Sequence, residues 1–184
     1  MQSFEEYYHV INEAFQDKDF IKNKLNRHYA FHETSVDFLP KILRDGRLCS
    51  LYVKSIEDGT LDHLLDGLLA AKARENVFNG MSYVYTSIMR DLDKIKWYMG
   101  ITSNECMFVI KLDSIEDAEY KEGENGVVRI PDCILVNNHT IEEIVIYEDF
   151  DYDDITNTAK ELASDLNIPL SIGWREESIM KYIS

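Results

Sequence analysis

The chain has 184 residues, a formal net charge of −15 and an isoelectric point near 4.6, and this length favours a single domain with a substantial hydrophobic core. The acidic balance argues against broad, sequence-independent binding to nucleic acid, because such binding depends on Lys and Arg side chains that neutralise phosphates. No apolar run approaches a membrane span, and three distant cysteines, Cys49, Cys106 and Cys133, predict no disulfide framework, so we expect a soluble protein of the reducing cytoplasm.

The first part of the chain predicts helices around one short strand. Residues 3–25 carry apolar side chains at helical spacing and predict an N-terminal helical layer. Tyr29–Phe31 predict a strand, and a helix capped by Ser35 or Asp37 follows it. Gly46 suits the left-handed position that ends such a helix.

The second part of the chain is mostly strand. Runs rich in β-branched and aromatic residues, separated by Gly, Asn, Asp or Pro, predict strands over residues 82–87, 106–112, 127–130, 141–147 and 168–174. Helical spacing predicts helices over residues 61–69, 91–99 and 154–166. Because most strands come late and are joined by short connections, the order predicts an α+β domain on an antiparallel or mixed sheet.

Several common chemistries have no support in the sequence. The strings GxxxxGK[ST], GxGxxG and GxSxG are absent, so neither a phosphate-binding loop nor a hydrolase elbow is predicted. The five histidines form no HExxH or zinc-ligand spacing. The acidic run at residues 148–154 lacks the pattern of an EF-hand and is typical of a solvated loop. We therefore expect no metal site.

His32 and Thr34 are polar residues at the end of an apolar strand. Alternate residues of a strand point to the same face, so the imidazole and the hydroxyl can bind one ligand from one side. They suit a ribose hydroxyl or a carboxamide, and the helix that follows aims unpaired N–H groups at the same place. Taken by themselves, the two residues favour a structural role, in which His32 forms a hydrogen bond within the fold and Thr34 caps the helix.

The segment AFHETSVDFLPKILRDGRL, residues 30–48, resembles the first motif of the ADP-ribosyltransferase superfamily, in both its poly(ADP-ribose) polymerase-like and its DarT-like toxin branches. The resemblance implies one ADP-ribosyltransferase-like domain over residues 1–184, with a mostly antiparallel split sheet and a helical layer at residues 1–27. It also implies that His32 and Thr34 hold the adenosine ribose and nicotinamide ends of NAD.

A second segment, SYVYTSIMRDLDKIKWYMG, resembles the family's next strand and helix. The resemblance implies that Tyr85 stacks on the nicotinamide ring and that Tyr98 is the aromatic residue of the following helix. Without the first motif, both tyrosines would be interpreted as core aromatic residues. The same segment resembles a group of uncharacterised phage-abortive-infection proteins, and a relationship to that group would weaken the case for catalysis.

The family's third motif places a catalytic glutamate at the start of the penultimate core strand, and two registers are open. If GVVRIPD is that strand, the expected position falls near Gly126 or Val127, and Glu124 is the candidate. If EEIVIY is that strand, the candidate is Glu143. We prefer the first register because it keeps the family's strand order. Arg44 and Arg129 are candidates for the NAD pyrophosphate, although surface solubility explains Arg44 equally well.

These resemblances imply an NAD-dependent mono-ADP-ribosyltransferase of toxin, effector or phage-defence type, with NAD as substrate and no membrane partner. The acidic surface favours a protein target over a nucleic acid. The site of action is the cytoplasm, in the producing cell or in a cell into which the protein is delivered. Because the preferred register lacks a glutamate at the expected position, the alternative is a binding or interaction module with the same fold and no transferase activity. An RNA phosphotransferase is a third and weaker alternative, because such enzymes need a basic site.

Overall fold

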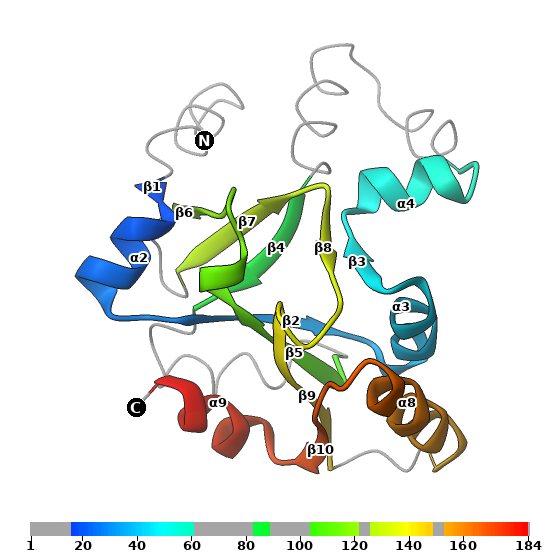
Figure 1. Ribbon diagram of the computed structural model, residues 1–184. Helices are drawn as coiled ribbons and strands as arrows, with labels where there is room; N and C mark the ends of the chain where they lie inside the picture. Colours follow the sequence, from blue (N-terminus) through cyan, green and yellow to red (C-terminus); the bar gives the residue numbers. More distant parts are fainter. Residues whose placement is uncertain (1–15, 61–82, 89–103, 122–125, 149–152, 184) are drawn as a thin grey trace, which may run out of the picture.

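The computed structural model describes residues 16–60, 83–88, 104–121, 126–148 and 153–183 (Figure 1). Its helices and strands are, in chain order, β1 (Gln16–Asp17), α2 (Lys18–Leu25), β2 (Tyr29–Thr34), the 3-10 helix η1 (Val36–Phe38), α3 (Leu39–Asp45), β3 (Arg47–Cys49), α4 (Leu51–Glu57), β4 (Tyr83–Ser87), β5 (Cys106–Lys111), the 3-10 helix η2 (Leu112–Ser114), β6 (Glu119–Lys121), β7 (Val127–Pro131), β8 (Cys133–Leu135), β9 (Ile141–Tyr147), α8 (Asp153–Asp165), β10 (Leu170–Gly173) and α9 (Arg175–Ile183). The helices predicted over residues 61–69 and 91–99 lie outside the described residues, as does most of the N-terminal layer.

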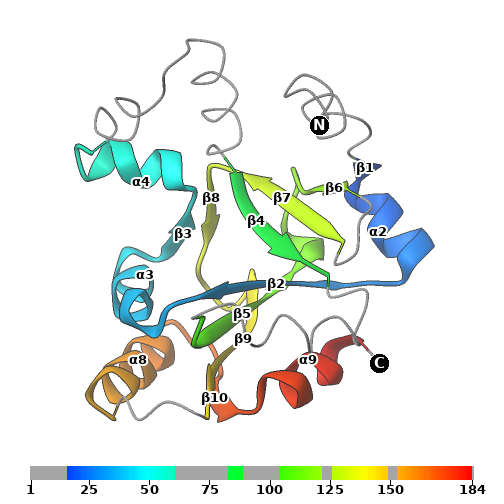
Figure 2. The ribbon, with the colours of Figure 1, turned by 180° about the vertical axis from the view of Figure 1, so that it is seen from behind.

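Eight strands form one mixed, mostly antiparallel sheet in the order β1-β6-β7-β4-β2-β5-β9-β10 (Figures 1 and 2). The pair β9–β10 is parallel, and the other neighbours are antiparallel. The predicted α+β class is therefore confirmed, and each of the six predicted strands is present. Within the described ranges, no helix combines the length and the apolar character that crossing a bilayer requires.

The sheet divides between β2 and β4. These two strands share a single register pair, Phe31 opposite Ser87, whereas β2 pairs with β5 over six residues and β4 pairs with β7 over five. Figures 1 and 2 show β4 running away from β2 at a steep angle. We call β2-β5-β9-β10 the His32 half-sheet and β1-β6-β7-β4 the Tyr85 half-sheet.

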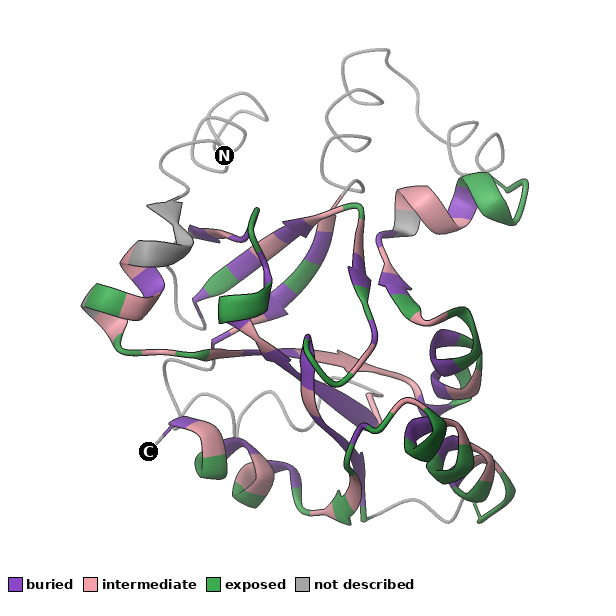
Figure 3. Ribbon diagram, viewed as in Figure 1, coloured by how far each residue is buried: buried purple, intermediate pink, exposed green. Residues whose placement is uncertain are grey.

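Two apolar cores lie on opposite faces of the His32 half-sheet, because alternate residues of its strands point to opposite sides. The larger core contains Ala30 of β2 and joins both half-sheets to α3 and α8. The smaller core contains Phe31 and lies under α9, which contributes Ile179 and Ile183. β5 is buried on both faces, and Figure 3 shows buried residues concentrated along these central strands.

The turn after β2 follows the capping chemistry expected from the sequence. The Ser35 hydroxyl accepts a hydrogen bond from the Asp37 amide and donates one to Glu105 Oε2 at 2.8 Å. The same Glu105 oxygen accepts from the Val36 amide at 3.1 Å. At the other end of α3, Gly46 has a φ of 64°, a left-handed conformation that a side chain would strain. Ser35 thus caps the 3-10 helix η1 that precedes α3, whereas α3 itself begins after Phe38 without a side-chain cap, and the predicted helix end at Gly46 is confirmed.

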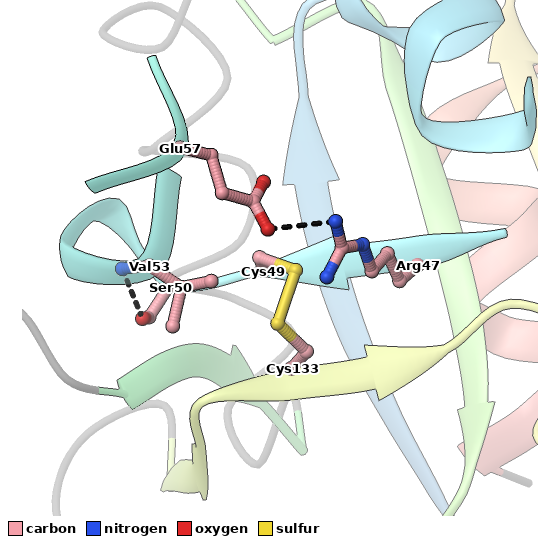
Figure 4. The surroundings of a disulfide bond; sticks show 6 residues. All are labelled: Arg47, Cys49, Ser50, Val53, Glu57 and Cys133. Carbon is pink, nitrogen blue, oxygen red and sulfur yellow. Dashed lines mark hydrogen bonds and ion pairs between the residues drawn. A yellow bond between two sulfur atoms is a disulfide. The ribbon is translucent and has the colours of Figure 1, made fainter. Parts of the chain in front are cut away.

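β3 and β8 form a separate two-stranded sheet, and a disulfide joins Cys49 to Cys133 across it (Figure 4). The hydrogen bonds from Ser50 N to Asp132 O and from Val136 N to Gly46 O flank this pair, so the cysteines occupy a non-hydrogen-bonded position, where facing side chains are closest. The expectation of no disulfide is therefore wrong, and the inference of a reducing compartment loses the support that it drew from that expectation. Spacing in the sequence cannot reveal a partner 84 residues away.

We predict that reducing this disulfide lowers the free energy of unfolding by about 2–4 kcal/mol, because the unfolded chain is then freed from a long closed loop. Urea unfolding with and without a thiol reductant measures the difference. The double variant Cys49→Ser/Cys133→Ser is the control, since the reductant should leave its midpoint unchanged. Equal midpoints for the wild-type protein in the two conditions would contradict a stabilising crosslink.

Candidate functional site

His32 lies on β2 where the two half-sheets meet. Its Nδ1 lies 2.9 Å from the backbone carbonyl oxygen of Tyr85. A carbonyl oxygen only accepts, so Nδ1 carries the proton and donates. In the neutral imidazole, Nε2 is then an acceptor with a fixed direction. The contact to a neighbouring strand therefore fixes both the tautomer and the orientation of the ring.

Burial determines the charge of this imidazole. Desolvation lowers the pKa of His32 below its ordinary value, and this effect outweighs the opposing contributions of the Tyr85 carbonyl and the nearby Glu33 carboxylate. The ring is consequently neutral at pH 7. A neutral ring keeps Nε2 available as an acceptor for a hydroxyl group.

Thr34 ends β2 on the same face as His32, as the sequence predicted. Its backbone carbonyl accepts hydrogen bonds from the Glu105 amide at 3.1 Å and from Cys106 Sγ at 3.4 Å. Its side chain is partly exposed.

The thiol of Cys106 is buried. This burial, and secondly the nearby Glu105 carboxylate, raise the pKa of the thiol to about 12, so this cysteine is a core residue and not a nucleophile.

The phenol of Tyr85 lies on the other side of the sheet from the His32 ring. On β4, Val84 and Thr86 are buried and alternate with Tyr85, whose exposed fraction is 46%. Ser87 faces the same side as Tyr85, and its register partner Phe31 belongs to the core under α9. The structure therefore brings the His32 imidazole to the main chain of Tyr85, while the Tyr85 phenol occupies the opposite face.

A row of side chains surrounds Tyr85 on that face. Arg129 of β7 is its register partner, and the Arg129 guanidinium lies 4.4 Å from the centre of the Tyr83 ring. Arg129 also forms an ion pair with Glu119 of β6. The rings of Tyr83 and Tyr85 are 6.4 Å apart. This face of the Tyr85 half-sheet thus combines two aromatic rings with a guanidinium, which suits a flat ligand that carries negative charge.

Glu33, between the two predicted ligand-binding residues, was not singled out by the sequence. Its side chain points toward α9 and is 11% exposed. Arg175 Nη2 donates to Glu33 Oε2 at 2.7 Å, Arg175 Nε forms a second bond, and the Tyr147 hydroxyl donates to Oε1 at 2.5 Å. This buried cluster joins β2, β9 and α9. Strand alternation predicts the face of Glu33, but nothing in the local sequence identifies its partners.

Glu143 lies two strands from β2 and on the face of the sheet opposite His32. It points to the α9 face of β9, where it accepts hydrogen bonds from Tyr182 Oη at 2.5 Å and from Lys181 Nζ at 2.9 Å. Burial favours the neutral carboxyl, but these hydrogen bonds outweigh it and hold the pKa of Glu143 below its ordinary value. β2 and β5 separate β9 from β4, so the structure does not bring Glu143 to Tyr85.

The other predicted carboxylate, Glu124, lies outside the described residues, as does Tyr98. The chain is fixed two residues after Glu124, because the Gly126 carbonyl accepts a hydrogen bond from the Ile88 amide at 3.0 Å. Gly126 has a φ of 60°, and a Cβ there would lie 2.5 Å from the Ile88 side chain, so only glycine fits. The next residue, Val127, stands opposite Ser87.

Arg44 is exposed in the last turn of α3, at the end of that helix remote from Ser35. Its position is that of a surface residue near a helix C-terminus, where a positive charge is favourable.

Comparison with models of protein families and with curated protein sequences finds no match to this chain. The candidate site is therefore described by its own geometry. Among the residues that the structure describes, no three His, Cys, Asp or Glu side chains are grouped as metal ligands.

The lowered pKa of His32 makes a testable prediction about pH. In the unfolded chain, the His32 imidazole has its ordinary pKa of about 6.5, so it binds a proton at a higher pH than it does in the folded chain. The free energy of unfolding should therefore fall as the pH drops below about 6.5, down to the folded-state pKa. Titration of the His32 ring by NMR and urea unfolding across this range measure both quantities.

The variant His32→Gln should show a smaller loss of stability over the same pH range. The variant His139→Gln, at an exposed loop position, is the matched control and should behave like the wild-type protein. A His32 ring that titrates above its ordinary pKa would contradict the desolvated environment.

Proposed function

We propose that the protein is an NAD-dependent mono-ADP-ribosyltransferase of toxin, effector or phage-defence type. The observation that carries this proposal is the position of His32 at the junction of the half-sheets, held by the Tyr85 carbonyl at 2.9 Å. Its Nε2 is a fixed, neutral acceptor for a ribose hydroxyl, and the Thr34 hydroxyl on the same face adds a second polar contact. An ADP-ribosyltransferase-like split sheet needs such a junction, where two groups of strands separate.

The half-exposed ring of Tyr85 supports the same proposal. It lies on the face opposite His32, so a dinucleotide bound at the junction would have to contact both faces of the sheet, at the point where β2 and β4 share a single register pair. The Tyr85 ring then offers a flat surface to the nicotinamide. Arg129, beside Tyr83 on the same face, offers a guanidinium toward the pyrophosphate.

The strand order favours Glu124 over Glu143 as the carboxylate of this site. β7 pairs directly with β4, and its first residue, Val127, is opposite Ser87, two residues from Tyr85. The loop that contains Glu124 enters β7 at Gly126, which is fixed against Ile88. Glu124 precedes this fixed residue by two positions in the sequence. Glu143 is two strands further away and already holds Lys181.

In the proposed reaction, the bond between the ribose anomeric carbon and nicotinamide breaks, and neutral nicotinamide leaves. Positive charge develops on the ribose, and the Glu124 carboxylate stabilises it. An oxygen or nitrogen atom of the target then bonds to the anomeric carbon and loses its proton to the carboxylate or to water. The neutral His32 ring takes no proton in this scheme, and its role is to position the ribose.

A second candidate function is a binding module with the same fold and no transferase activity. The observation that favours it is Val127, an apolar residue at the position where the preferred register expects the glutamate. Glu119 and Glu143 cannot replace it, because each is held in an ion pair, with Arg129 and Lys181 respectively.

We predict that NAD raises the thermal stability of the protein, because a ligand that binds only the folded state stabilises it. At an NAD concentration of about 100 times Kd, the gain is about 2.7 kcal/mol. The variant His32→Ala should lose this gain, whereas the exposed-site control His139→Ala should keep it. An NAD-induced shift of equal size in His32→Ala would contradict the proposed role of His32.

Incubation with labelled NAD and a cell lysate should yield modified product and free nicotinamide. We predict that Glu124→Gln lowers this transfer about 100-fold or more while the thermal shift with NAD remains, because one charge-stabilising group is lost. Stabilisation by NAD without any transfer would favour the binding module. Absence of both stabilisation and transfer would contradict the transferase and leave the binding module, with a ligand other than NAD.

A further inference from the structure

β10 (Leu170–Gly173) is the last strand of the sheet, and no described strand pairs with its outer edge. Pro169 O accepts a hydrogen bond from the Ile144 amide, and Gly173 O accepts one from the Glu148 amide, so these positions bond inward to β9 and its continuation. Hydrogen bonds along a strand alternate in direction. The N–H and C=O groups of Leu170 and Ile172 therefore point outward, at the open edge.

The open edge belongs to a short strand of four residues that follows Pro169, and it carries an apolar row. Ile172 and Trp174 occupy alternate positions, and each is 48% exposed. Leu170, at the preceding alternate position, packs partly into the larger core. Proteins that avoid edge-to-edge pairing place Lys or Pro within such strands or cover them, but the sequence LSIG contains neither residue. The edge thus offers both backbone pairing and an apolar surface.

The negative charge around this edge favours a partner strand that carries positive charge. Glu148 follows β9 on the inner side of β10, where its amide donates a hydrogen bond to the Gly173 carbonyl, and its side chain is exposed. Glu177, in the first turn of α9, is also exposed. The whole chain has a net charge of −15, so a second copy would bring further negative charge to this edge. A basic partner is complementary to it.

We propose that the outer edge of β10 binds an extended, basic peptide segment of a partner protein by strand addition. The partner's backbone pairs with the outward N–H and C=O groups of Leu170 and Ile172. Its apolar side chains on one face pack against Ile172 and Trp174, and its Lys or Arg side chains approach Glu148 and Glu177. This proposal is independent of NAD, because β10 is separated from β2 by β5 and β9.

A short fluorescein-labelled peptide of alternating lysine and valine, titrated with the full chain, tests the proposal by fluorescence anisotropy. We expect the variant Ile172→Pro to weaken binding about tenfold or more, because proline removes an outward N–H and obstructs the arriving strand. The ladder to β9 does not use that N–H, so the fold should persist, as thermal unfolding would show. Ile172→Val keeps the N–H and should bind like the wild-type protein.

Two further peptides provide readouts that do not depend on the folding of a variant. A fully N-methylated peptide cannot donate backbone hydrogen bonds and should not bind, and a glutamate-for-lysine peptide should bind more weakly than the basic one. Equal binding of all three peptides, or no binding of the basic peptide at about 1 mM, would overturn the proposal. So would sedimentation of the protein alone as a dimer that Ile172→Pro dissociates, because a second copy would then occupy the edge.

Discussion

The single register pair between β2 and β4 is the constraint on which the candidate site depends. A continuous ladder would place consecutive residues of both strands side by side and leave no room between them. Here the ladder stops after Phe31 and Ser87, and the next residue of β2, His32, bonds to a β4 carbonyl with its side chain instead. The imidazole thus satisfies a backbone acceptor that the interrupted ladder leaves open, which explains why a polar residue is tolerated in a strand with little solvent around it.

The ion-pair cluster of Glu33 fixes the orientation of the strand that carries His32. Strand alternation means that any twist of β2 that moved His32 would also move Glu33. Glu33 is held by Arg175 and by the Tyr147 hydroxyl, in a site with little exposure. A buried ion pair of this kind contributes little net stability relative to apolar residues, but it strongly disfavours arrangements that separate the charges. Its effect is therefore to specify which face of β2 meets α9.

The sequence predicted the elements whose signals are local, and it failed where a partner was distant. The strands with long apolar runs and the cap at Ser35 follow from residue types and spacing alone. The pairing of β3 with β8, and hence the Cys49–Cys133 disulfide, depends on segments that meet only in three dimensions. α9 was missed because nine residues with mixed polarity give a weak periodic signal. Similarly, His32 and Thr34 were correctly assigned to one face, but their relation to the Tyr85 phenol required the register of β4.

The C-terminal helix decides which carboxylates of the His32 half-sheet are available for chemistry. Arg175 forms an ion pair with Glu33. Lys181 forms an ion pair with Glu143, which also accepts a hydrogen bond from the Tyr182 hydroxyl. Both negative charges are therefore already compensated by fixed partners. A carboxylate that stabilises a developing positive charge must have that charge as its principal partner in the transition state. An ion pair must be broken before such a group can act, at a cost that opposes catalysis. Glu33 and Glu143 are therefore poorly suited to supply the anion of the proposed transferase reaction.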